Sequence, residues 1–207
     1  RNVPPARIEQ VAHHYEIFGG VSPITELTRK QAAGLQQRLA AAGTPLPVFV
    51  GMRNWHPFLI DTLAEMSRAG VRRALGFIMA AQASYSSCQQ YKENVRDARQ
   101  SIREAGLADL DVTYVASWFE HEGFVAANAA HVRTAAGALP AEVRESARLI
   151  FTAHSIPAGM AERSQYREQL MASARAVAER TGMADWALVY HSRSGRPHGP
   201  WLGPRVG

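Results

Sequence analysis

Short apolar runs alternate along this chain with longer segments in which apolar residues recur every three or four positions. Such runs are typical of buried strands, and the periodic segments are typical of helices with one apolar face. The pattern predicts strands at residues 46–52, 73–80, 110–116, 147–153 and 186–191. It predicts helices at residues 5–18, 23–42, 57–69, 88–105, 119–138 and 160–181. The chain is therefore built largely from β–α repeats.

Glycine residues mark the ends of several predicted helices, as is common where a helix stops in the left-handed conformation. These glycines are Gly43, Gly70, Gly106 and Gly182. Apolar strands joined to helices by short connections favour an α/β fold, with a mostly parallel sheet covered by helices on both faces. In such sheets ligands bind beyond the carboxyl ends of the strands. The residues that follow the strands are therefore the first candidates for a site.

Composition narrows the class of protein. The chain has 207 residues, of which 46% are apolar and 20% charged, as expected for a globular protein with one sizeable core or two small ones. No apolar run approaches the ~20 residues of a membrane-spanning helix, and no signal peptide is expected. The formal charge of +5 is spread along the chain. This spread does not favour nucleic-acid binding, and it suits either solubility or a small anionic substrate.

The single cysteine, Cys88, excludes an internal disulfide and a zinc site built from several thiolates. A lone thiol also suits a reducing compartment, so we expect a cytoplasmic protein. The sequence lacks a G-x-G-x-x-G motif, a P-loop and a G-x-S-x-G motif. Dinucleotide enzymes, P-loop enzymes and ordinary α/β-hydrolases are thereby disfavoured.

The segment "LIFTAHSIP" contains the most informative polar residue, because His154 directly follows the predicted strand at residues 147–153. A neutral imidazole at that edge of a sheet can bind a metal ion or accept a proton near neutral pH. The structural alternative is a histidine that is merely hydrogen-bonded at a strand end. Position alone leaves both interpretations open.

Other candidates have simpler explanations beside the functional one. In "GGVSPI", backbone N–H groups and the Ser22 hydroxyl could hold an anion, or Ser22 and Pro23 could simply begin a helix. In the loop at residues 80–91, Tyr85 and Tyr91 could contact an aromatic ligand, or the loop could be solvated.

Adjacent polar residues offer weaker candidates. Glu120, His121 and Glu122 are consecutive, so on a helix they point in different directions and cannot bind one ion together. His13 and His14 are also adjacent, so only one of them can face a site.

Seven segments, taken in order, resemble the ferrochelatase family, in particular the soluble bacterial type that acts on coproporphyrin. They are "YEIFGGVSPI", "VGMRNWHPFLIDTLAEM", "SYSSCQQYKENV", "SWFEHEGFV", "FTAHSIP", "YREQL" and "HSRSGRPHGPWLGP". The resemblance spans nearly the whole chain. It implies a chelatase-like fold of two Rossmann-like halves with a porphyrin cleft. Residues 1–140 would form most of the first half, and residues 141–207 the start of an incomplete second half.

The resemblance implies a lyase of haem biosynthesis that inserts ferrous iron, its substrate, into coproporphyrin III or protoporphyrin IX. His154 matches the active-site histidine of the family, which binds the metal or removes pyrrole protons. Ser22, Tyr91 and Tyr15 match porphyrin-contacting positions. His14 stands where the family often has an arginine that meets an acidic propionate of the porphyrin.

Two departures from the family pattern shape the expectation. Cys88 matches one ligand of a two-iron, two-sulfur cluster found in some bacterial members, but this chain has no other cysteine to complete that cluster. The first strand of the family and the glutamate that faces the active-site histidine are expected outside residues 1–207. We therefore expect a fragment with impaired activity.

The functional alternatives are a porphyrin- or haem-binding module without activity, and a related chelatase for another metal and tetrapyrrole. The sequence indicates no nucleic-acid partner, no integral membrane segment and no particular oligomeric state.

Overall fold

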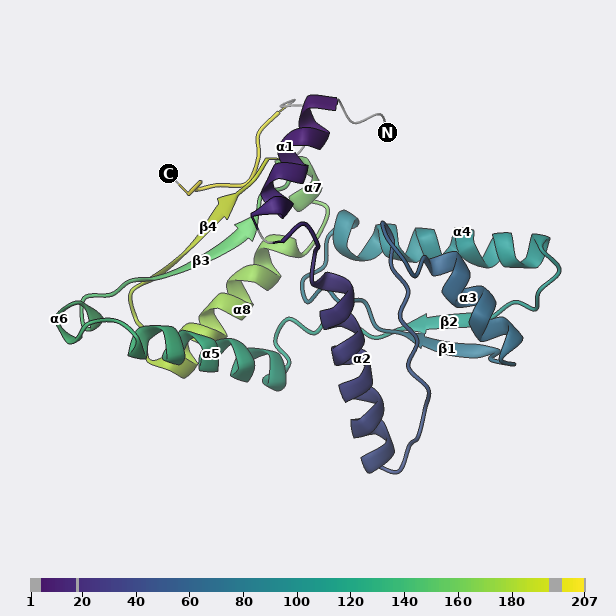
Figure 1. Cartoon of the computed structure of the whole chain (residues 1–207). Helices are drawn as coiled ribbons and strands as arrows, with labels where there is room; N and C mark the ends of the chain where they lie inside the picture. The colour runs from purple at the N-terminus through teal and green to yellow at the C-terminus, as the bar shows by residue number, and fades with distance from the viewer. Residues whose placement is uncertain (1–4, 18, 194–198, 207) are drawn as a thin grey trace. The chain divides into compact units, whose positions relative to one another are not determined.

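The computed structural model describes residues 5–17, 19–193 and 199–206. Its longer helices are α1 (Pro5–Glu16), α2 (Ile24–Ala41), α3 (Leu59–Arg68), α4 (Gln90–Glu104), α5 (Glu122–Gly137) and α8 (Tyr166–Thr181). Its shorter ones are α6 (Ala141–Arg144), α7 (Ala158–Ala161) and a π-helical turn, η1 (Tyr85–Gln89). The strands are β1 (Arg73–Gly76), β2 (Asp111–Tyr114), β3 (Leu149–His154) and β4 (Trp186–His191), as Figure 1 shows.

Two compact units make up the chain. The first contains residues 1–72 and 94–110, and the second contains residues 73–93 and 111–207. The predicted boundary after residue 140 concerns the halves of the family fold, and it remains a prediction.

None of the described helices is long and apolar enough to cross a membrane.

The first unit buries apolar side chains from α3 and α4. Leu63 and Ala64 are buried on α3, Ala98 and Ile102 are buried one turn apart on α4, and Leu110 is fully buried after α4. The helical spacing of these residues gives each helix one apolar face. The Ser67 hydroxyl donates to the carbonyl of Ala108 over 2.7 Å, which joins α3 to the segment that follows α4.

The predicted strand at residues 46–52 is wrong, because most of this segment is extended but unpaired. Pro45 and Pro47 lack the N–H groups that a strand ladder requires. The Val48 amide instead donates to the side chain of Gln36 on α2 over 2.9 Å. Met52 alone forms a bridge, with Phe58.

The second unit contains the four described strands, in two parallel pairs. In the first pair Arg73 lies opposite Asp111, and Gly76 lies opposite Tyr114. In the second pair Leu149 lies opposite Trp186, and His154 lies opposite His191. The predicted parallel pairing and mixed α/β architecture are therefore confirmed, although β1 and β2 are shorter than the apolar runs suggested.

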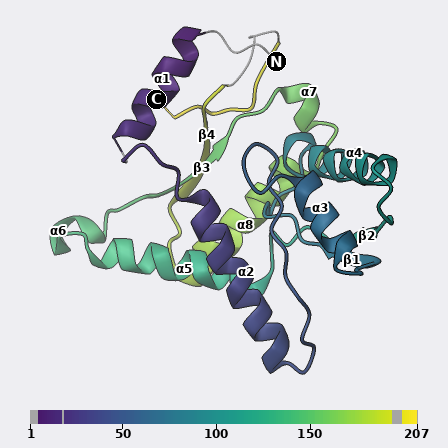
Figure 2. The ribbon, with the colours of Figure 1, turned by 45° about the vertical axis from the view of Figure 1, so that its right-hand side comes forward.

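Helix α8 forms much of the core of the second unit. It contacts both β3 and β4 and packs along α5, as Figures 1 and 2 both show. Val177 of α8 is buried against Val125 and Ala129 of α5. A second cluster lies around the ends of β3 and β4, and its buried members are Ala153, Ile156, Ala161, Tyr190 and Leu202.

Three helix boundaries differ from the predictions because local side chains satisfy the backbone. The helix predicted at residues 160–181 is interrupted, since Ser164 donates to Ala161 and accepts from the amide of Tyr166. The helix predicted from residue 119 begins at Glu122, because the His121 ring accepts from the amide of Gly123. The helix predicted from residue 88 is preceded by η1, which Ser84 caps.

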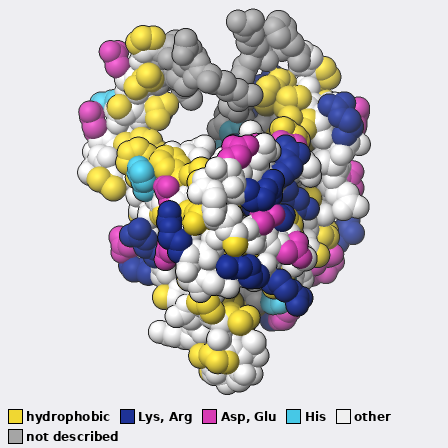
Figure 3. All heavy atoms as spheres, turned by 90° about the vertical axis from the view of Figure 1, so that its right-hand side faces the viewer, with side chains coloured by type: hydrophobic (Ala, Val, Ile, Leu, Met, Phe, Trp, Pro, Cys, Tyr) yellow, Lys and Arg dark blue, Asp and Glu magenta, His cyan; other side chains and the backbone are white. Residues whose placement is uncertain are grey.

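Basic and acidic side chains alternate on and beside α4, and Figure 3 shows them next to one another on the face that it presents. Asp109 accepts hydrogen bonds from Arg99 and Arg103 at 2.9 to 3.0 Å. The Arg99 bond is the main cause that lowers the pKa of Asp109 to about 2, against an opposing effect of burial. The Arg103 bond and the amide of Leu110 lower it further.

We expect Asp109→Asn to lower the free energy of unfolding by about 1 kcal/mol near neutral pH, because the carboxylate is partly solvent-screened. The folded-state pKa lies below the unfolded value, so the stabilisation is present above about pH 4 and is lost as the pH falls toward 2. Urea unfolding of both proteins across this range measures the difference. The exposed Asp97→Asn provides the control, and an equal effect of both substitutions would contradict this assignment.

Candidate functional site

The candidate site lies at the carboxyl ends of β3 and β4. Burial alternates along β3, and at the end of both strands a buried residue, Ala153 or Tyr190, is followed by an exposed histidine, His154 or His191. Because the strands are parallel and in register, the two histidines lie opposite each other. Their ring centroids are 5.7 Å apart, and the ring planes are inclined by 80°. Two imidazoles are thus brought together at the edge where α/β proteins bind ligands.

The backbone that follows β3 is fixed by hydrogen bonds to β4 and to the segment at residues 200–206, which we call the closing segment. The Ser155 amide donates to the carbonyl of His191 over 2.8 Å. The Ser155 hydroxyl, in a residue only 2% exposed, donates to the carbonyl of Leu202 over 3.0 Å. The Leu202 amide donates to the carbonyl of Ile156 over 3.0 Å. The motifs "AHSIP" and "WLGP" are therefore hydrogen-bonded to each other.

The closing segment also contacts β4. The Tyr190 amide donates to the carbonyl of Pro204 over 2.8 Å, and the Val206 amide donates to the carbonyl of Tyr190 over 3.0 Å. These bonds satisfy the backbone of a buried residue directly before His191. Both histidines are thus exposed side chains whose neighbouring backbone is hydrogen-bonded.

Two tyrosines lie behind the histidines. The Tyr166 hydroxyl donates to the carbonyl of His154 over 3.1 Å. Burial raises the pKa of Tyr166, and the neighbouring Tyr190 raises it further. Burial is also the main cause that raises the pKa of Tyr190. Both phenols therefore stay protonated near neutral pH, and Tyr166 can serve as a donor that holds the end of β3.

The loop before η1 uses its hydroxyl groups internally. Ser84 and Ser87 form a reciprocal cap, and the Ser87 hydroxyl also donates to the carbonyl of Gln82 over 2.9 Å. The Tyr85 hydroxyl donates to Glu93 over 2.9 Å. These contacts support the structural interpretation of this loop.

Two sequence-predicted positions lie close to this loop. Tyr91 is half-buried in the first turn of α4 and belongs to the same unit as His154. The Cys88 thiol is half-buried, 3.5 Å from the Ser87 hydroxyl.

The remaining predicted porphyrin-contacting residues lie in the first unit. Ser22 is half-buried directly before α2, and its hydroxyl accepts from the amide of Ile24 over 3.4 Å. Tyr15 is 47% exposed near the end of α1. The side chain of His14 lies outside the part that the structure describes. The predicted residues therefore fall into two sets: Ser22, Tyr15 and His14 in the first unit, and His154 and Tyr91 in the second.

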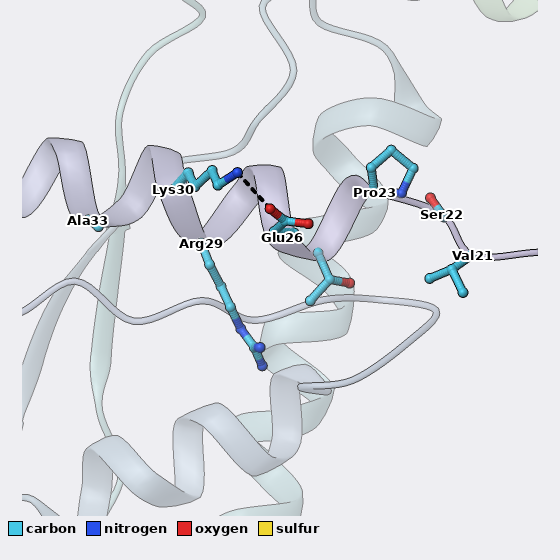
Figure 4. Close-up of a pocket in the computed structure, with 8 residues that line it drawn as sticks. Val21, Ser22, Pro23, Glu26, Arg29, Lys30 and Ala33 are labelled. Carbon is cyan, nitrogen blue, oxygen red and sulfur yellow. Dashed lines mark ion pairs between the residues drawn. The ribbon is translucent and has the colours of Figure 1, made fainter. Parts of the chain in front are cut away.

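A hollow of about 640 Å³ lies beside Ser22 on the first turns of α2. Lys30 and Glu26 form an ion pair of 2.6 Å on its wall. Arg29 extends from the same helix away from that pair, as Figure 4 shows. The lining of the hollow includes the Ser22 hydroxyl at its helix-start end and the Arg29 guanidinium, a group suited to binding a carboxylate.

The structure adds two candidate residues, His191 and Arg29, that the sequence did not single out. His191 ends a predicted strand, as His154 follows one, so the parallel pairing of their strands was the available signal. Arg29 follows Ser22 by seven residues, so helical spacing places it two turns further along the same side.

The described histidines, cysteine and acidic residues form no group of three that could hold a metal ion. At the ends of β3 and β4 the structure brings together two imidazoles, those of His154 and His191.

Comparison with known proteins agrees with the pattern of motifs. The family model described as ferrochelatase matches residues 1–207. A ferrochelatase of Rhodopirellula baltica is 47% identical over all of this chain and 58% of its own length. Coproporphyrin III ferrochelatases of Nocardia farcinica and Streptomyces coelicolor are 45% and 41% identical over the whole chain and 60% and 59% of their own lengths. The chain thus spans about three fifths of these relatives, and it belongs to the ferrochelatase family.

Proposed function

We propose that the protein containing this chain inserts ferrous iron into a porphyrin, with coproporphyrin III as the preferred substrate. Membership of the family supports the reaction, and the names of the Nocardia and Streptomyces relatives support the substrate. The observation that carries the proposal is the exposed imidazole of His154 at the carboxyl end of β3. We also propose a cytoplasmic location, supported by the single free cysteine.

Metal insertion has a definite proton balance. A free-base porphyrin loses two pyrrole N–H protons as its four nitrogens bind the metal ion, so a base must accept them. A neutral imidazole can accept one such proton or bind the incoming metal. His154 is suited to either role because its backbone is held by Tyr166 while its side chain is exposed.

The porphyrin carboxylates require partners of opposite charge. Ser22 and Arg29 line one hollow in the first unit, and we propose that Ser22 contacts the porphyrin and that Arg29 binds a propionate. Arg29 has no ion-pair partner among the residues that the structure describes, and the nearby Glu26 carboxylate is paired with Lys30 instead. Tyr91, Tyr15 and His14 are proposed as further porphyrin contacts on the family resemblance alone.

We expect His154→Ala to lower kcat for iron insertion by about a hundredfold or more, the usual contribution of a positioned acid–base group. The assay follows the porphyrin absorbance of the full-length protein under anaerobic conditions with ferrous iron. His131→Ala replaces another exposed histidine, on α5, and serves as the control. Wild-type turnover in His154→Ala would remove this residue from the mechanism.

We expect Arg29→Ala to raise KM for coproporphyrin III about tenfold with little change in kcat, because a charged hydrogen bond contributes about 1.5–3 kcal/mol. The effect should disappear with the methyl-esterified porphyrin, which has no carboxylate to bind. Arg38→Ala, at the far end of α2, provides the matched loss of charge. Equal effects of both substitutions, or an undiminished effect with the ester, would argue against this contact.

A further inference from the structure

We propose that His191 is a second imidazole ligand for the metal ion that approaches His154. The inference rests on the proposed function and adds to it a residue that neither the motifs nor the family resemblance assigned. Its basis is the register of β3 and β4, which sets the two histidines opposite each other at the ends of their strands. Both side chains are exposed, so a hydrated ion can reach them.

The separation of the rings suits a shared ion. Imidazole nitrogen binds borderline divalent metals at about 2.0–2.1 Å, so two imidazoles on one tetrahedral ion have ring centroids about 5 Å apart. The observed centroids are 5.7 Å apart. The two rings therefore lie at nearly the separation that a shared ion requires.

A hydroxyl group lies beside one nitrogen of the His191 ring. Its Nδ1 lies 2.9 Å from the Ser192 hydroxyl, and its carbonyl accepts the Ser155 amide. A partner on one ring nitrogen commonly orients a metal-binding histidine and leaves the other nitrogen for the ion. Ser192 has a φ of 52°, a left-handed conformation that is uncommon for serine. The chain thus adopts an unfavourable turn at the residue that contacts the ring.

A site that passes its metal ion to another molecule needs open coordination positions, and two protein ligands leave such positions. Structural metal sites use four protein ligands, whereas two imidazoles leave positions for water and then for the porphyrin nitrogens. The pair accepts the divalent first-row ions that prefer nitrogen ligands, which include ferrous iron. We infer that the pair holds the ion briefly at the strand ends and releases it to the stronger four-nitrogen ligand.

Metal binding without porphyrin tests this role. Titration of the full-length protein with Zn²⁺, followed by calorimetry, should show a Kd that rises about tenfold or more in His191→Ala, as is usual when the support of a metal site is lost. His191→Gln, which retains bulk and polarity, should weaken binding similarly. Ser192→Ala should have a smaller effect in the same direction. His131→Ala provides the control, and thermal melting confirms that each variant is folded.

Co²⁺ gives a second readout that a structural role of His191 would not change. The wild-type protein should show a cobalt absorption spectrum altered by both His154→Ala and His191→Ala. An unchanged Zn²⁺ affinity and cobalt spectrum in folded His191→Ala would overturn the inference while leaving iron insertion intact. Zn²⁺ binding that depends on both histidines, in a protein that inserts no iron, would instead retain the site and refute the proposed function.

Discussion

The hydrogen bond from the buried Ser155 hydroxyl to the carbonyl of Leu202 is the constraint on which the candidate site depends. A polar group buried to this degree must be paired, and leaving a partner unpaired costs about 1–3 kcal/mol. The bond fixes the closing segment against the residues that follow β3. The amides of Ala158 and Leu202 add bonds between the same two stretches. As a result, the turn that contains Pro157 is hydrogen-bonded to the closing segment at several points, and Pro157 forms an antiparallel bridge with Trp201.

This arrangement allows exposed polar side chains and buried apolar side chains to lie next to each other at the strand ends. The ends of β3 and β4 must expose polar side chains, yet Ala153, Ile156, Tyr190 and Leu202 directly beside them are buried. The last two residues of each strand separate the two requirements, because Ala153 and Tyr190 are buried while the histidines that follow them are exposed. The backbone bonds at the strand ends, from Ser155 to His191 and from Tyr190 to Pro204, use neither imidazole ring. The rings can therefore act on a metal ion or a proton while the fold supports them from behind.

Much of this unit was predictable from sequence because its signals are local. The apolar run at residues 186–191 gave the bounds of β4, and the position of His154 after such a run placed it at a strand end. The wrong predictions also have specific structural causes. Residues 46–52 are apolar like a strand, but pairing depends on a partner and on N–H groups that Pro45 and Pro47 lack. The break before α8 depends on the Ser164 side chain, which a helical pattern does not register.

The candidate site was less predictable than the fold. The role of His154 rested on the ordered motifs, whereas His191 required the register of two strands separated by α8. Arg29 likewise needed the course of α2 relative to Ser22. In each case the missing information was which residues lie near each other in the folded chain. Residue type and periodicity do not contain that information.

Hydrogen exchange of individual amides tests most directly whether the closing segment holds the strand ends. In Ser155→Ala, the amides of Leu202 and Tyr190 should exchange about tenfold faster or more, because loss of the hydroxyl leaves the Leu202 carbonyl unpaired. Amides within α5 should keep their wild-type rates. Unchanged protection of Leu202 and Tyr190 in this variant would contradict the account, since the strand ends would then be held without the Ser155 hydrogen bond.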